Sequence, residues 1–187
     1  MAERRVEHDV EHLVGRAQAG DQWAFGELVR IHQHEVFTLA VRLVGDRTLA
    51  ADVAQEAFVR AWKAIGRFRG DAAFSTWLHR ITVNAAWTQR TRAKHHQAHD
   101  LDAVREMPDS DLRSSPELAG ERAELRMVLG GALNRLPQQQ RAVVVLKDIY
   151  GWSHQEIAES LSISVTAAKV RLHRAHVRLR QMLRTAS

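Results

Sequence analysis

The chain has 187 residues, of which 45% are hydrophobic, so it is long enough for one or two domains with hydrophobic cores. It contains no cysteine, which excludes disulfide bonds and thiol sensing within the chain, and 27 basic against 22 acidic residues give a net charge of +5. No apolar run approaches the roughly 18 residues of a membrane span, and the charged amino end lacks the apolar core of a signal peptide, so we expect a cytoplasmic protein without membrane insertion.

Low glycine and proline content and helical spacing of apolar residues predict an all-α protein. The first domain, expected over residues 1–94, contains turn signals at Gly20-Asp21, Gly45-Asp46 and Gly66 to Asp71. Phe58, Trp62 and Ile65 recur at helical spacing and predict core positions. These signals delimit four expected helices, over residues 6–19, 21–44, 49–65 and 74–91.

The periodicity fails in the segment RAKHHQAHDLDAVREMPDSDLRSSPE. From Asp100 to Asp111 this segment has five acids against one arginine, and it contains two prolines. We therefore predict an acidic flexible linker over residues 95–115. His95, His96 and His99 lie at its start, but no further ligand of suitable spacing follows, so a solvated helix end is the preferred interpretation over a metal site.

The second domain, expected over residues 116–187, is predicted to contain four helices. Ser115-Pro116 begins the first, and Leu136-Pro137 ends it and opens the second, PQQQRAVVVLKDIY, which stops at Gly151. Ser153 and Glu156 match a capping box, so the third helix begins near His154. A polar turn over residues 162–164 then leads into the fourth helix, with Ser164 as its N-cap. Two helices joined in this way are typical of a helix-turn-helix, whose second helix enters the major groove of DNA.

The outward face of the fourth helix is basic. Six Lys or Arg and no Asp or Glu occur from Ser160 to Ser187. An ordinary helical hairpin with a solvated basic face is the alternative, but solvated helices usually mix their charges. We therefore predict that DNA contacts this face, through Ser164, Thr166, Ala167, Lys169, Val170, Arg171, His173 and Arg174.

Two segments together resemble a known family. They are DVAQEAFVRAWKAIGRFRGDAAFSTWLHRITVN, from Asp52 to Asn84, and LPQQQRAVVVLKDIYGWSHQEIAESLSISVTAAKVRLHRA, from Leu136 to Ala175. In this order and at this separation they resemble bacterial RNA polymerase sigma factors of the extracytoplasmic-function (ECF) group. The similarity covers both predicted domains.

The resemblance implies roles in the first domain. This domain is similar to sigma region 2, in which the segment matching Asp52, Gln55 and Glu56 docks on the clamp helices of the polymerase β′ subunit. Spacing at i, i+3 and i+4 puts these residues on one helix face, although solvation of that face or pairing with Arg47 or Arg60 is the alternative. By position, a pocket for a flipped base of the promoter −10 element is implied at Ala64, Phe68 and Asn84, with its loop over residues 66–72.

Two departures from the family pattern have consequences. Arg80 and Ile81 stand where principal sigma factors carry adjacent tryptophans, so the resemblance implies melting by base capture rather than by an aromatic wedge. Val170 stands where the group commonly has serine, which replaces a hydroxyl with methyl groups that can pack on a thymine methyl. Within the −35 recognition helix we expect Arg171 and Arg174 to hold phosphates and the other residues to meet base edges.

The resemblance also implies the partners. They are core polymerase, through its β′ clamp and β flap, promoter DNA, and a dedicated anti-sigma factor, with no cofactor, metal or enzymatic activity. The acidic linker is expected to thread through polymerase, because DNA would repel it. Two alternatives stay open from the residues alone: a stand-alone helix-turn-helix regulator whose first domain binds a ligand or dimerises, and a helical hydrolase or metal protein built around His95, His96 and His99.

Overall fold

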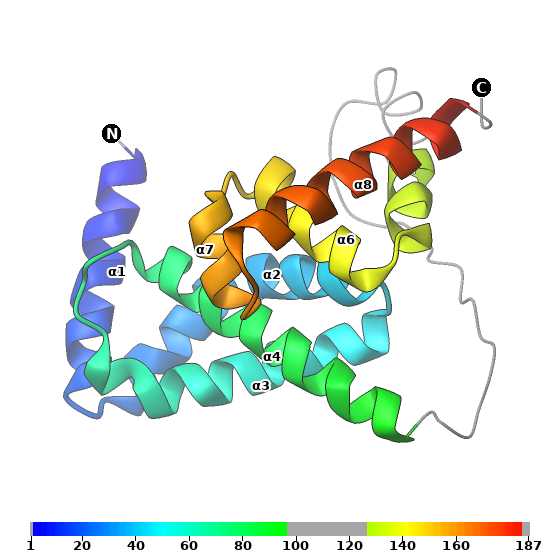
Figure 1. The fold of residues 1–187 in the computed structure, drawn as a ribbon. Coiled ribbons are helices and arrows are strands. Elements are labelled where there is room, and N and C mark those ends of the chain that lie inside the picture. The colour runs from blue at the N-terminus through cyan, green and yellow to red at the C-terminus, as the bar shows by residue number, and fades with distance from the viewer. Residues whose placement is uncertain (1, 97–126, 185–187) are drawn as a thin grey trace, which may run out of the picture. The chain divides into compact units, whose positions relative to one another are not determined.

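The computed structural model describes residues 2–96 and 127–184, with side chains for residues 9–89 and 127–184 (Figure 1). Regular structure in these two ranges is helical throughout and contains no strand, which confirms the all-α prediction. The chain divides into two compact units, Met1–Asp100 and Leu101–Ser187. Residues 97–115 of the predicted linker, and the predicted helix start at Ser115-Pro116, lie outside the described residues. No helix in the described ranges is long and apolar enough to cross a membrane.

The first unit is built around one central helix, α2, which packs against the three others. Its fully buried side chains include Leu28, Val36 and Leu39. The elements are α1 (Ala2–Gln18), α2 (Gln22–Val44), α3 (Arg47–Ala64), a short 3-10 turn η1 (Ile65–Arg67) and α4 (Phe74–His96). Four helices were predicted here, with ends that differ from these by up to five residues.

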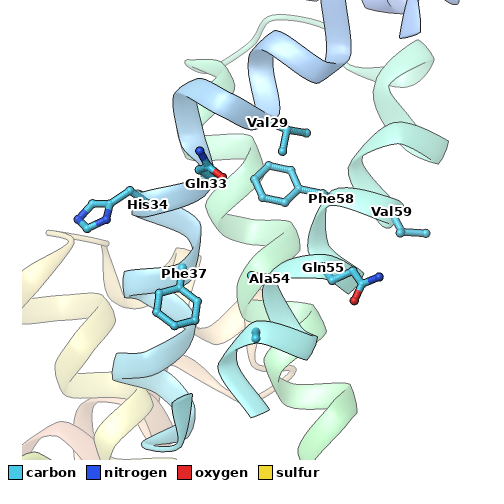
Figure 2. Close-up of a pocket in the computed structure, with 9 residues that line it drawn as sticks. Val29, Gln33, His34, Phe37, Ala54, Gln55, Phe58 and Val59 are labelled. Atoms are coloured by element: carbon cyan, nitrogen blue, oxygen red, sulfur yellow. The ribbon is translucent and has the colours of Figure 1, made fainter. Parts of the chain in front are cut away.

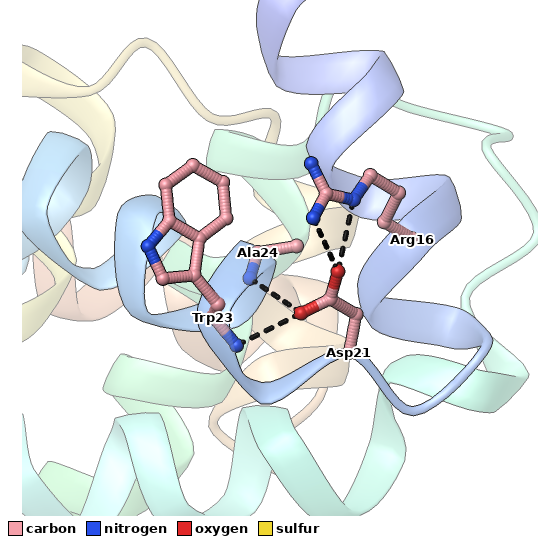
Figure 3. A network of polar contacts seen from close by, with 4 residues as sticks. All are labelled: Arg16, Asp21, Trp23 and Ala24. Carbon is pink, nitrogen blue, oxygen red and sulfur yellow. Dashed lines mark hydrogen bonds and ion pairs between the residues drawn. The ribbon is translucent and has the colours of Figure 1, made fainter.

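Acidic caps at the two turn signals set the starts of α2 and α3. Asp21 accepts hydrogen bonds from the main-chain N–H groups of Trp23 and Ala24, at 2.9 and 3.1 Å, and Arg16 Nε donates to its other oxygen at 2.9 Å (Figure 3). The Ala24 amide and the Arg16 guanidinium hold the pKa of the Asp21 carboxyl below its ordinary value. Asp46 likewise accepts from Leu49 N at 2.8 Å, so α3 begins two residues before the predicted start.

The second unit holds a helical segment over residues 127–135, α6 (Gln138–Val144), η3 (Val145–Ile149), α7 (His154–Ser160) and α8 (Val165–Arg184). The helix predicted over residues 137–150 is not uniform, because η3 is a π-helix closed by a bond from Tyr150 N to Val145 O at 3.2 Å. Six successive residues, 141–146, are buried at this transition. One apolar cluster joins Leu136 and Val144 to the inner face of α8, formed by Leu172, Ala175, Leu179 and Met182.

Both predicted caps of the helix-turn-helix are present. Ser153 and Glu156 form the reciprocal capping box of α7, and Ser164 Oγ accepts from Ala167 N at 3.1 Å at the start of α8. Ser162 in the turn between them adopts a left-handed conformation with φ of 52°, which the sequence did not indicate because glycine usually occupies such positions. These contacts fix the direction in which α8 leaves the turn.

Candidate protein and nucleic-acid interfaces

The acidic face of α3 separates into two parts. Asp52 and Gln55 are exposed, whereas Glu56 is about one third exposed and accepts a hydrogen bond from Arg60 Nε at 2.7 Å. Arg60 Nη1 in turn donates to Thr88 Oγ1 on α4 at 3.4 Å. The alternative of local pairing therefore applies to Glu56, and Asp52 and Gln55 are the members of the predicted set that face solvent.

A mostly apolar groove lies beside this face, between α2 and α3 (Figure 2). Phe58 and Phe37 are half-buried in it, and Gln55 lies on its rim. Phe58 was predicted as a core residue, but in the structure it lines the groove. Trp62 packs on Phe25, and Ile65 is buried as predicted. The groove is lined by Val29, Gln33, His34, Phe37, Ala51, Ala54, Gln55, Phe58 and Val59.

The residues predicted to capture a base lie along the seam between α3 and α4. At one end of this seam Arg60 meets Thr88, and at the other the ring of Phe68 lies 5.1 Å from that of Trp77. On α3, Ala64 follows Arg60 by one helical turn, toward the loop. On α4, Asn84 precedes Thr88 by one helical turn, also toward the loop. Ala64 and Asn84 therefore lie between the Arg60–Thr88 contact and the Phe68–Trp77 contact. Helix spacing therefore places Ala64 and Asn84 on the faces of α3 and α4 that carry these two contacts.

Phe68 is held in a fixed position rather than projecting freely. Its ring also meets Phe74 edge-on at 5.8 Å, and its main-chain O accepts from Gln18 Nε2 of α1 at 2.7 Å. Gln18 Nε2 also donates to Ile65 O at 3.2 Å, so a side chain of α1 holds the start of the loop by two hydrogen bonds. Asn84 differs, because it is exposed. The seam therefore offers a supported half-buried ring and a solvent-facing amide, which suit stacking and hydrogen bonding to a base edge.

The basic face of α8 is exposed as predicted for most of its members. Ser164, Thr166, Lys169, Val170, His173 and Arg174 are exposed and Ala167 is half-buried. Arg171 differs, because it is only partly exposed and its Nη1 atom is buried. It lies three residues after Ala168 and four before Ala175, and both of these alanines are fully buried. The structure therefore places Arg171 at the edge of the inner face rather than on the outward face.

A contact that sequence reasoning missed fixes α8 on its unit. His176 Nε2 lies 2.7 Å from Asp148 Oδ2 of η3, and both side chains are 42% exposed. The two residues are 28 positions apart in the sequence. Asp148 lies on the π-helix η3, which the sequence did not distinguish from an ordinary helix. The pair orients the half of α8 that follows the residues predicted to contact DNA.

The histidines considered for a metal site fall largely outside the described residues. His95 and His96 form the end of α4, but their side chains, like the whole of His99, lie outside the described residues. Among the residues that the structure describes, no group of three His, Cys, Asp or Glu side chains could hold a metal ion.

Comparison with known proteins gives matches to both units. Residues 28–96 match Sigma-70 region 2, and residues 126–179 match Sigma-70 region 4. The chain is 36% identical over 181 residues to the RNA polymerase sigma-H factor of Pseudomonas aeruginosa, covering 88% of this chain and 89% of that one. It is 39% identical over 171 residues to the ECF RNA polymerase sigma-E factor of Escherichia coli K12, covering 87% and 88%.

A solved structure has a similar fold. The structure of CnrH in complex with the cytosolic domain of CnrY matches with a TM-score of 0.61 and 29% identity, over 96% of this chain and 99% of CnrH. The similarity therefore extends across both helical units.

Proposed function

This chain belongs to the sigma-70 family, in its ECF group. We propose that the α2–α3 side of the first unit binds polymerase, that the α3–α4 seam binds the −10 element, and that α8 binds the −35 element. As a sigma factor it is a transcription initiation factor that binds core RNA polymerase and directs it to −10 and −35 promoter elements. The observation that carries this conclusion is the pair of region matches, one to each unit. A stand-alone helix-turn-helix regulator does not account for the region 2 match.

Polymerase binding is assigned to the α2–α3 side of the first unit. Asp52 and Gln55 are exposed there, and Gln55 borders the apolar groove that contains Phe37 and Phe58. An apolar groove rimmed by polar groups is a suitable surface for helices of a partner, since burial of its apolar lining supplies affinity and the rim supplies register. We assign the β′ clamp to this surface and the β flap to the second unit.

Promoter contact is assigned to the α3–α4 seam and to α8. The seam would receive one unpaired base of the −10 element, stacked near Phe68 and bonded by Asn84. The exposed basic residues of α8 would enter the −35 major groove. On this basis residues 1–94 act as region 2 and residues 116–187 as region 4, joined by a linker over residues 95–115.

These roles require binding only. Opening of DNA can be driven by capture of an unpaired base, so we propose that the protein performs no catalytic step and needs no cofactor. Its site of action is the cytoplasm, where bacterial polymerase and promoters are located.

Reconstitution with bacterial core polymerase on a randomised promoter library tests the proposed function. The holoenzyme is expected to enrich sequences with two fixed elements at constant spacing, and core polymerase alone is not. Tight, sequence-specific promoter binding by the protein without polymerase would contradict the proposal.

Replacement of Asn84 with alanine is expected to reduce open-complex formation about fivefold, because an exposed amide that bonds a base edge is lost at a cost of ~1 kcal/mol. Preference at one −10 position should relax, and −35 binding should not change. Permanganate reactivity of the melted strand measures the effect.

Phe68→Ala provides a second test with a different control. Because Phe68 is half-buried against Phe74 and Trp77, the variant is expected to lose stability by ~1–3 kcal/mol as well as base capture. A thermal unfolding curve taken beside the transcription assay separates the two. A loss of stability with unchanged −10 preference would show that Phe68 is a packing residue.

A dedicated inhibitor is expected to compete with core polymerase. CnrH forms a complex with the cytosolic domain of CnrY, and we propose that this chain is likewise held by an anti-sigma partner. Such a partner should cover the face around Asp52 to Glu56, or the segment 137–149. Titration of the inhibitor into labelled holoenzyme should release the sigma factor, and simultaneous binding of both at full affinity would refute this form of control.

A further inference from the structure

Two histidines and a glutamate join the middle of α2 to the first turns of α4. Glu35 Oε1 lies 3.0 Å from His79 Nε2, and Glu35 Oε2 lies 3.7 Å from His32 Nδ1. His32 and His79 are buried, whereas the Glu35 side chain is 46% exposed. The neighbouring His32 and His79 side chains hold the pKa of the Glu35 carboxyl well below its ordinary value, so the group carries its charge at neutral pH. We call these three residues the α2–α4 bridge.

The residue at the N-cap position of α4 is apolar, unlike those of α2 and α3. Ala73 O accepts the first helical hydrogen bond, from Trp77 N at 3.1 Å, so Ala73 occupies the N-cap position. Its methyl side chain cannot accept a hydrogen bond from the first turn, whereas Asp21 and Asp46 do so for α2 and α3. The first turns of α4 therefore lack the stabilisation that a polar cap gives α2 and α3, and a contact with α2 can supply it.

The bridge is continuous with the aromatic residues that support the base-capturing loop. The ring of His32 lies 5.4 Å from that of Phe74, the first residue of α4. Phe74 is 6% exposed, and its ring contacts Phe68 at 5.8 Å and Trp77 at 5.5 Å. A shift of the first turns of α4 would therefore move the surface on which Phe68 rests.

We propose that the α2–α4 bridge is a positioning device for base capture, with Glu35 as the residue that fixes α4, and through Phe74 the ring of Phe68, in the geometry that receives the unpaired base. This inference rests on the base-capture role proposed above. The bridge residues act through Phe74 and Phe68 and do not contact the base. Their effect is confined to the −10 strand, because the recognition helix α8 belongs to the other unit.

The test measures how strongly the holoenzyme depends on the captured base. Holoenzyme made from the full chain is bound to fork-junction DNA from a selected promoter, with a duplex −35 element and an unpaired −10 strand. An abasic nucleotide is placed at each −10 position in turn. The unaltered protein is expected to lose affinity about tenfold at one position, in keeping with the stacking energy of one base on an aromatic ring.

Glu35→Gln keeps the shape of the side chain and removes its charge. This variant is expected to reduce the abasic penalty from about tenfold to about twofold, while a mismatch in the −35 element costs the same as before. Glu27→Gln is the matched control, because Glu27 pairs with Arg30 on the same helix, at 2.8 Å, and both residues belong to α2. It should retain the full penalty. His79→Gln, which removes the other end of the 3.0 Å contact, should repeat the result of Glu35→Gln.

An equal abasic penalty in Glu35→Gln and in the unaltered protein would overturn the positioning role and leave base capture intact. Absence of a penalty at every position in the unaltered protein would overturn base capture itself, and this inference with it. If both variants lost −35 binding together with the abasic penalty, the bridge would be maintaining the fold, which would also overturn the proposal.

Discussion

Replacing Asp52, Gln55 and Glu56 together with alanine is expected to weaken binding to core RNA polymerase about 100-fold, or ~3 kcal/mol, the cost of losing a small cluster of dominant interface residues. Asp52 and Gln55 are exposed on one face of α3, beside the apolar groove, and make the larger contribution to this loss. Glu56 differs because Arg60 already binds it at 2.7 Å. Asp52→Ala with Gln55→Ala should therefore reproduce most of the effect of the triple substitution.

Titration of fluorescently labelled protein with core polymerase measures the affinity, and circular dichroism confirms that the helical content is unchanged. The control is an Arg69→Ala, Asp71→Ala variant, which removes an exposed ion pair of 3.1 Å in the loop before α4, outside the α2–α3 groove, and should bind core polymerase normally. Equal co-elution of the triple variant and the unaltered protein with core would remove the polymerase-binding assignment of this face. Tight binding by the double variant, with loss only on adding Glu56→Ala, would instead assign the interaction to Glu56.

Local signals predicted most of the helix boundaries. The capping box at Ser153 and the N-cap at Ser164 are both formed, because a cap depends on residues only three positions apart. The start of α3 was predicted two residues late, since Asp46 was interpreted as a turn residue and not as the cap that it is. Helical spacing also predicts an inner face of α8 through Ala168, Leu172, Ala175, Leu179 and Met182, which is confirmed, whereas Val165, on the same stripe, is 40% exposed.

Contacts between distant positions could not be predicted in the same way. Nothing near Glu35 in the sequence indicates that His79, 44 residues later, will meet its carboxylate, and no local signal distinguishes the π-helix at Val145–Ile149 from an ordinary helix. The pairing of Glu56 with Arg60 was foreseen as an alternative to polymerase docking, but the link from Arg60 to Thr88 was not. Arg171 was assigned outward because it is not a member of the apolar stripe, whereas its spacing from Ala168 and Ala175 puts it at the edge of the packed face.

The exposed cations of α8 are expected to differ in what they do at the −35 element. Arg174 lies on the outward flank, where a guanidinium reaches phosphates, so Arg174→Ala should weaken binding to all −35 sequences alike and reduce the salt dependence by about one unit of slope. Val170 is 42% exposed near the start of α8, where side chains of a recognition helix meet base edges.

Val170→Ser or Lys169→Ala should therefore change which −35 sequence is preferred, by ~1–3 kcal/mol at one base pair. Val170→Ser removes methyl groups that can pack on a thymine methyl, and Lys169→Ala removes a hydrogen-bond donor to a base edge. Arg184→Ala is the matched control, since this exposed arginine ends the same helix about four turns later, beyond reach of the same base pairs, and should leave the ranking intact. Randomised-promoter selection with each variant gives the ranking directly. If Val170→Ser preserved the ranked −35 preferences of the unaltered protein, the placement of α8 in the major groove with Val170 facing the bases would be wrong.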